Sequence, residues 1–251
     1  MTEYWICPAI FLILIAAIHA GRFVAANLPV RYVDDHTKES VKRATAFLMT
    51  IAALLLGLLI STGKSAFDKQ SDAVSNLSAK IAHLDELLAH YGPDAAPARQ
   101  ELKQSARQVL TALWSGPAIQ PTLTPTSRGR NEKFLDTLFA LHPANEAQAV
   151  VKAQAIAVAN TLIEDGFKLA NMQHSVSTPL VIAVVVGWLT IIFASLGFCS
   201  SGNIVAAASE YIGAFAATAA VLLVLEYDRP FGGLLQISRR SLDVALAALG
   251  Q

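Results

Sequence analysis

Residues 44–60 read ATAFLMTIAALLLGLLI, a run without a single charged side chain. A helix rises about 1.5 Å per residue, so this run is long enough to cross a hydrocarbon layer about 30 Å thick. Helices of soluble proteins are rarely apolar on every side over such a length. The run therefore predicts a membrane span.

Three further runs have the same character: Tyr4–Ala20, Leu180–Cys199 and Ile204–Leu225. The composition agrees, because 54% of the residues are hydrophobic and 15% are charged, against about 25% charged in soluble domains. We predict an all-α integral membrane protein with four transmembrane helices and a helical domain inserted between the second and the third.

The predicted organisation has four parts. Residues 1–60 form a transmembrane hairpin, 61–179 an extramembrane helical domain, 180–228 a second hairpin and 229–251 a C-terminal amphipathic tail. In the insertion, apolar positions step by three and four residues, which is the spacing of one helix face: Val74, Leu77, Ile81, Leu84, Leu88 and Tyr91. The tail helix, Ser238–Leu249, carries Arg239 and Arg240, which suit a lipid surface or a neighbouring subunit.

Several classes of function lack support in the sequence. The formal net charge is zero, so the basic surface of a nucleic-acid-binding protein is not expected. His83, Glu86 and His90 share a helix face, but nothing completes a ligand set of three or four, so we expect no metal site. No serine–histidine–aspartate arrangement stands out. We therefore expect no catalytic residues, no cofactor and no enzyme.

Short segments over nearly the whole chain resemble a family of bacterial membrane proteins with a bestrophin-like domain. They are TKESVK at 37–42, LLLGLL at 54–59, GKSAFD at 63–68, AHYGP at 89–93 and LEYDRPFGG at 225–233. True bestrophins are pentameric anion channels with a helical cytosolic region between the second and third spans. The resemblance implies a cell inner-membrane protein whose inserted domain is cytoplasmic. An acidic calcium-binding run should follow the last segment, but residues 233–236 read GLLQ, so no calcium site is implied.

One face of the second span is a candidate pore lining. At about 100° per residue, six residues fall within one sector of the helix: Ala46, Thr50, Ala53, Gly57, Ser61 and Lys64. Small side chains leave room for ions, hydroxyl groups replace part of their hydration, and Lys64 attracts anions at one mouth. The alternative is helix packing, because Gly57 and Ser61 form a small-xxx-small pair.

Two other groups of residues are candidates. Glu210 lies inside the fourth span, with His19 of the first span as a conceivable partner, and intramembrane carboxylates usually face a cavity or a partner. The alternative is an interfacial glutamate that reaches lipid headgroups. Four residues follow the last span: Asp228, Arg229, Pro230 and Phe231. They are expected either to anchor the C-terminal segment or to gate the channel.

The sequence favours a homo-oligomeric channel in the lipid bilayer. A subunit with four spans is too small to enclose a wide path, so a symmetric ring, with a pentamer favoured, would place one lining helix per subunit around small inorganic anions such as chloride. The alternative is a non-conducting scaffold or signalling protein whose helical domain binds a partner.

Overall fold

The computed structural model describes residues 5–29, 34–114, 125–172, 179–200 and 203–249. Within these residues the regular elements are all helices, with no strand. They are α1 (Ile6–Asn27), α2 (Asp35–Tyr91), the short 3-10 helix η2 (Pro93–Ala95), α3 (Ala96–Trp114), α4 (Pro125–Phe139), α5 (Glu146–Met172), α6 (Pro179–Cys199), α7 (Ile204–Tyr227) and α8 (Arg240–Ala248). The all-α prediction is confirmed.

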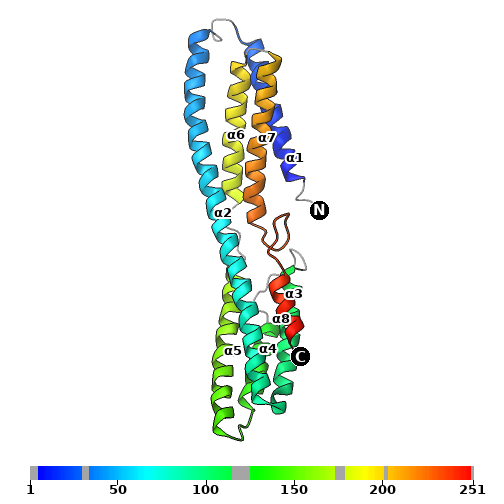
Figure 1. The fold of residues 1–251 in the computed structure, drawn as a ribbon. Helices are drawn as coiled ribbons and strands as arrows, with labels where there is room; N and C mark the ends of the chain where they lie inside the picture. Colours follow the sequence, from blue (N-terminus) through cyan, green and yellow to red (C-terminus); the bar gives the residue numbers. More distant parts are fainter. Residues whose placement is uncertain (1–4, 30–33, 115–124, 173–178, 201–202, 250–251) are drawn as a thin grey trace. The chain divides into compact units, whose positions relative to one another are not determined.

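The helix α2 is longer than the sequence analysis expects. The second apolar run and the first amphipathic helix of the insertion form one continuous helix of 57 residues (Figure 1). It begins where Asp34 Oδ1 accepts a hydrogen bond from the Thr37 amide at 2.9 Å. Hydrogen bonding from the Thr37 side chain, and then from its amide, lowers the pKa of Asp34. The helix ends before Gly92, whose φ of 113° favours glycine.

The described chain divides into two compact units. Unit 1 comprises residues 1–65 and 175–228, and unit 2 comprises residues 66–174 and 229–251. In unit 1, α1, α6 and α7 lie alongside the first part of α2 (Figure 1). Its core contains Leu14, Ile18, Leu189 and Val221. By length and composition, α1, α2, α6 and α7 each contain a stretch able to cross a membrane.

The helices α1 and α6 approach each other very closely through two glycines. A Cβ atom at Gly21 would overlap the carbonyl oxygen of Ala194, and one at Gly197 would overlap the carbonyl oxygen of Ile18. Small residues at such positions let helix backbones meet in a bilayer. This contact fixes α1 against α6.

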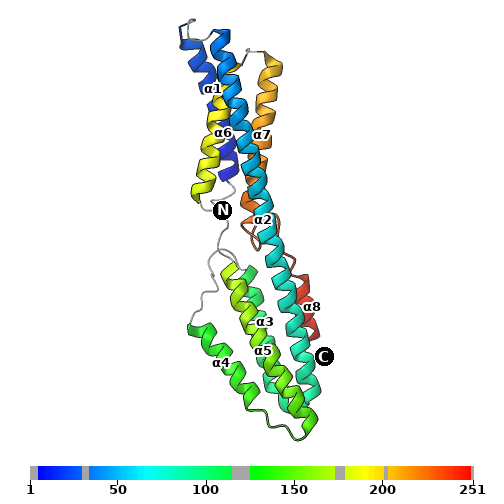
Figure 2. The ribbon, with the colours of Figure 1, turned by 90° about the vertical axis from the view of Figure 1, so that its left-hand side faces the viewer.

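Unit 2 packs α3, α4 and α5 with the second part of α2 (Figure 2). All six apolar positions predicted from Val74 to Tyr91 lie in its buried core, so that helix face is confirmed. The C-terminal segment belongs to the same core through Ile237, Leu242 and Leu249. The apolar side of α8 is therefore covered by unit 2. The expectation that Arg239 and Arg240 of this helix face a lipid surface or a neighbouring subunit stays a prediction.

Candidate functional site

The small-residue face of α2 is exposed on the single chain. Its members Ala46, Thr50, Ala53, Gly57, Ser61 and Lys64 are all exposed, and a Cβ at Gly57 would meet no atom within 4 Å. The residues of α2 that pack inside the subunit lie on another side: Thr45, Ala52 and Gly63. The face therefore does not pack within its own subunit.

The hydroxyl of Thr50 is already engaged. It donates to the carbonyl oxygen of Ala46 at 3.0 Å, which leaves only its oxygen lone pairs for an outside ligand. Thr62, one residue beyond Ser61, donates in the same way to the carbonyl oxygen of Leu58. Lys64 is the one charged residue among the six members of this face.

Two polar contacts in unit 1 join α1 to α7. Glu210 Oε2 accepts a hydrogen bond from Arg22 Nη2 at 2.7 Å, and the Glu210 and Arg22 side chains are 9% and 26% exposed. His19 Nε2 lies 3.2 Å from the hydroxyl of Tyr211. The Arg22 guanidinium also lies 6.0 Å from the centre of the Tyr211 ring, within range of a cation–π interaction.

The Glu210 carboxylate is thus paired with Arg22 and not with His19. Sequence reasoning missed Arg22, because the apolar run ends at Ala20 and the connection was expected to begin at Gly21. In the structure α1 continues to Asn27. The spacing of the two residues could have pointed to Arg22: it lies three residues after His19, so both share one face of a helix that continues past Ala20.

The corner after α7 is closed by backbone hydrogen bonds. Asp228 is the C-cap of α7, and the carbonyl oxygen of Arg229 accepts from the amides of Gly232 and Gly233 at 3.3 and 3.2 Å. The buried Pro230 accepts from the amide of Ile237 at 2.8 Å. Residues 228–237 therefore form a compact turn.

Tyr227, the last residue of α7, packs on α2 next to the small-residue face. A Cβ at Gly63 would lie 3.1 Å from Tyr227 Cβ, so only a glycine fits there without displacing the tyrosine. Gly63 lies between Ser61 and Lys64 of the candidate pore face. The end of α7 is thus in contact with α2 beside the last residues of that face.

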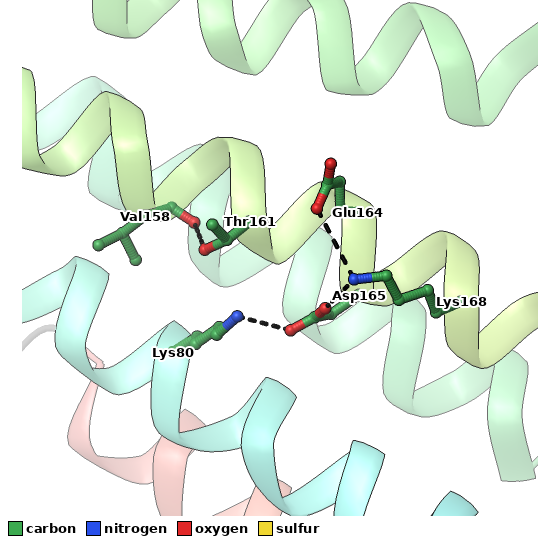
Figure 3. A network of polar contacts seen from close by, with 6 residues as sticks. All are labelled: Lys80, Val158, Thr161, Glu164, Asp165 and Lys168. Carbon is green, nitrogen blue, oxygen red and sulfur yellow. Dashed lines mark hydrogen bonds and ion pairs between the residues drawn. The ribbon is translucent and has the colours of Figure 1, made fainter.

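In unit 2, a network of charged side chains ties α2 to α5 (Figure 3). Lys80 Nζ donates to Asp165 Oδ2 at 2.6 Å, and Lys168 Nζ lies 3.3 Å from Asp165 Oδ1 and 3.7 Å from Glu164 Oε2. The hydrogen bond from Lys80, partly offset by burial, lowers the pKa of Asp165. This network holds α5 against α2.

A second ion pair ties α2 to α3. Arg99 Nε and Nη2 donate to the two carboxylate oxygens of the buried Asp85 at 2.7 and 2.8 Å. This bidentate contact raises the pKa of Arg99. Among the described residues, no group of three histidine, cysteine or acidic side chains is placed to hold a metal ion. The contacts of unit 2 thus organise its helices.

Comparison with known proteins identifies relatives by family and by fold. The family model for the bestrophin-like domain matches residues 12–242. No curated protein matches the chain.

Among solved structures, two mutant forms of a bacterial Bestrophin homolog from Klebsiella pneumoniae are similar in fold. One has a TM-score of 0.67 at 13% identity, with 96% of this chain and 99% of that chain covered. The other has a TM-score of 0.66 at 12% identity, with 94% and 95% covered. The crystal structure of a further membrane protein gives a TM-score of 0.67 at 11% identity, with 97% and 99% covered.

Proposed function

The chain belongs to the bestrophin-like family, and from this premise we propose that it forms a homo-oligomeric ion channel. The central pore is lined by the small-residue face of α2. In this proposal α1, α6, α7 and the first part of α2 cross the cell inner membrane, and unit 2 lies in the cytoplasm.

The exposure of that face is the observation that carries the proposal. Its six residues lie on a helix with a strongly apolar stretch, yet they include Thr50, Ser61 and Lys64 and are not covered by the subunit. Lipid contact favours large apolar side chains such as Leu54 and Leu58, which are exposed on a neighbouring side of the same helix. The small-residue face suits a water-filled axis.

A symmetric ring provides such an axis. Rotational symmetry brings the same face of each subunit to the centre, and a pentamer is the ring that the likeness to bestrophins favours. Copies of Lys64 would then form a positive ring at one end of the pore. Such a ring attracts small inorganic anions such as chloride.

Flux through liposomes tests the proposal. Purified full-length protein should pass chloride, and Gly57→Trp should abolish the flux because the bulky indole closes the axis. Leu58→Trp is the matched control, since Leu58 is the next residue along α2 and points about 100° away; its flux should persist. The mass of the oligomer should be unchanged in both variants. Tight vesicles containing intact wild-type oligomers would contradict the channel.

A further inference from the structure

We propose that His19 makes the contact between α1 and α7 sensitive to acid: the neutral imidazole strengthens the contact, and the imidazolium weakens it. Two polar contacts join these helices, one between His19 and Tyr211 and one between Arg22 and Glu210. All four residues lie in unit 1. The acid sensitivity requires no conduction, so it goes beyond the proposed channel.

The two contacts meet at one aromatic ring. The Tyr211 hydroxyl lies 3.2 Å from His19 Nε2, and the centres of the two rings are 6.1 Å apart. The Arg22 guanidinium lies 6.0 Å from the centre of the same Tyr211 ring. Because His19 and Arg22 are three residues apart, they are neighbours on one face of α1. A single tyrosine of α7 therefore interacts with both residues of that face.

The hydrogen bond of His19 depends on the charge of its ring. A neutral imidazole has one nitrogen that accepts a hydrogen bond, so with its proton on Nδ1 it accepts the Tyr211 hydroxyl hydrogen at Nε2. An imidazolium donates from both nitrogens and accepts from neither. Protonation therefore reverses the bond and leaves the Tyr211 hydroxyl hydrogen without this acceptor. Histidine is the side chain whose charge changes between about pH 5 and pH 8.

Protonation also adds a cation to a site that has one carboxylate. Glu210 already accepts from Arg22 at 2.7 Å, and Glu226, the other carboxylate of α7, lies sixteen residues further on, about 24 Å along the helix. The helix α6, which packs along α1, carries no charged side chain. Its end lies near two cations of α2, Lys38 and Lys42. The remaining ionisable groups of these helices are distant or uncharged: Cys7, Cys199 and Tyr227.

The surroundings of His19 give an added charge little compensation. His19 is exposed on the single chain, as are its apolar neighbours on α1, Ala16, Ala20 and Phe23. The helix α1 contains a stretch able to cross a membrane, and a charge in apolar surroundings costs free energy. This cost, the repulsion from Arg22 and the reversed hydrogen bond all act in one direction. The stabilisation by this contact is present at high pH and is lost as the pH falls.

The test compares the unfolding equilibrium of the full-length protein at about pH 8 and about pH 5.5, in detergent with added denaturing surfactant. His19→Gln removes the titrating ring and keeps a side chain that can hydrogen-bond to Tyr211. His36→Gln is the matched control, because His36 is an exposed histidine of unit 1 at the start of α2. Tyr211→Phe keeps the ring beside Arg22 and removes only the hydroxyl group.

Between the two pH values, the unfolding constant of the wild type should rise about fivefold more than that of His19→Gln. His36→Gln should follow the wild type. Tyr211→Phe should respond to acid less than the wild type, because its neutral imidazole has already lost the hydrogen bond. Hydrogen exchange, corrected for its intrinsic pH dependence, should show the loss of protection at the end of α1 and the start of α7.

Equal pH profiles for the wild type and His19→Gln would overturn the proposal, and so would a response that disappears in His36→Gln. If His19→Gln does not fold, Tyr211→Phe provides the same test, since a full wild-type response in that variant would show that the His19 contact is not the origin. Unchanged protection of α1 and α7 in acid would likewise refute it.

Discussion

Arg22 on α1 and Glu210 on α7 form an ion pair, with 2.7 Å between Nη2 and Oε2. The Glu210 side chain is nearly buried, so its negative charge is stabilised by Arg22 and not by water. Burial removes water from the carboxylate, which costs free energy, and the attraction to the cation offsets that cost. If the cation is removed, the desolvation cost remains without compensation. The pair therefore ties the first apolar helix to the last.

Removal of one partner should destabilise unit 1. Arg22→Gln is expected to lower the free energy of unfolding by about 3 kcal/mol, because it leaves a buried unpaired carboxylate. The double change Arg22→Met with Glu210→Leu should recover most of this loss, since no charge remains. Unfolding of the full chain in detergent by added denaturing surfactant measures both values.

The control for this prediction is the exposed pair of Arg43 and Glu39, which lie one helical turn apart at 2.6 Å. Arg43→Gln should change stability by less than about 0.5 kcal/mol. An Arg22→Gln variant as stable as Arg43→Gln would show that the pair of α1 and α7 contributes nothing.

The close approach of α1 and α6 gives a second prediction. Gly197→Ala should destabilise the protein by about 3 kcal/mol or more, because the added methyl group overlaps the Ile18 carbonyl and forces the helices apart. Gly187→Ala on the same helix is the matched control. A Cβ there meets no atom within 4 Å, so the change should be neutral or slightly stabilising. Equal effects at both sites in the unfolding assay would contradict the close contact.

The apolar helices and the buried face of the inserted helix were predicted well from the sequence, because both depend on the local spacing of apolar residues. Val74, Leu77 and Leu84 are buried as their spacing predicts. The continuity of α2 was not predicted, since a change from apolar to amphipathic composition was taken as a boundary. Nothing between Ile60 and Val74 terminates a helix: Gly63 is tolerated there and no proline occurs.

The contacts between distant segments were not accessible from local pattern. The pairing of Arg22 with Glu210 joins residues 188 positions apart, and no spacing rule connects them. The attachment of α8 to α3 is of the same kind. A short helix with one apolar side fits a lipid surface and a protein core equally well, and only the packing of Leu242 and Leu249 distinguishes the two.

The network of Lys80 and Asp165 should give a pH-dependent contribution to stability. Because Lys80 lowers the pKa of Asp165, the pair stabilises the fold above the ordinary aspartate pKa, near pH 4, and this stabilisation is lost as the pH falls through the lower folded-state value. Asp165→Asn should cost about 1 kcal/mol at pH 7. The difference from wild type should shrink below about pH 4.

Unfolding of the full chain as a function of pH measures this difference. Glu164→Gln is the control, because Glu164 is mostly exposed and meets Lys168 only at 3.7 Å. Its stability should follow the wild type at every pH. A difference for Asp165→Asn that is constant with pH would show that the effect does not come from the ionised carboxylate.

The charge at the end of the small-residue face should set ion preference. Lys64→Glu reverses the proposed ring of positive charge, so the ratio of chloride to sodium permeability should fall by about tenfold. Reversal potentials across a planar bilayer with a salt gradient measure the ratio. Lys42→Glu, an exposed site before the apolar run of α2, serves as the control for charge at a distance. An unchanged reversal potential for Lys64→Glu would place Lys64 away from the ion path.

The direction in which Gly57 faces within the assembled protein tests the channel most directly. A cryo-electron microscopy structure of the full-length oligomer in a lipid nanodisc measures it. We predict a rotationally symmetric ring in which Gly57 of every subunit faces a continuous axial passage. A ring in which Gly57 faces lipid, or a particle with no passage along its axis, would contradict the account.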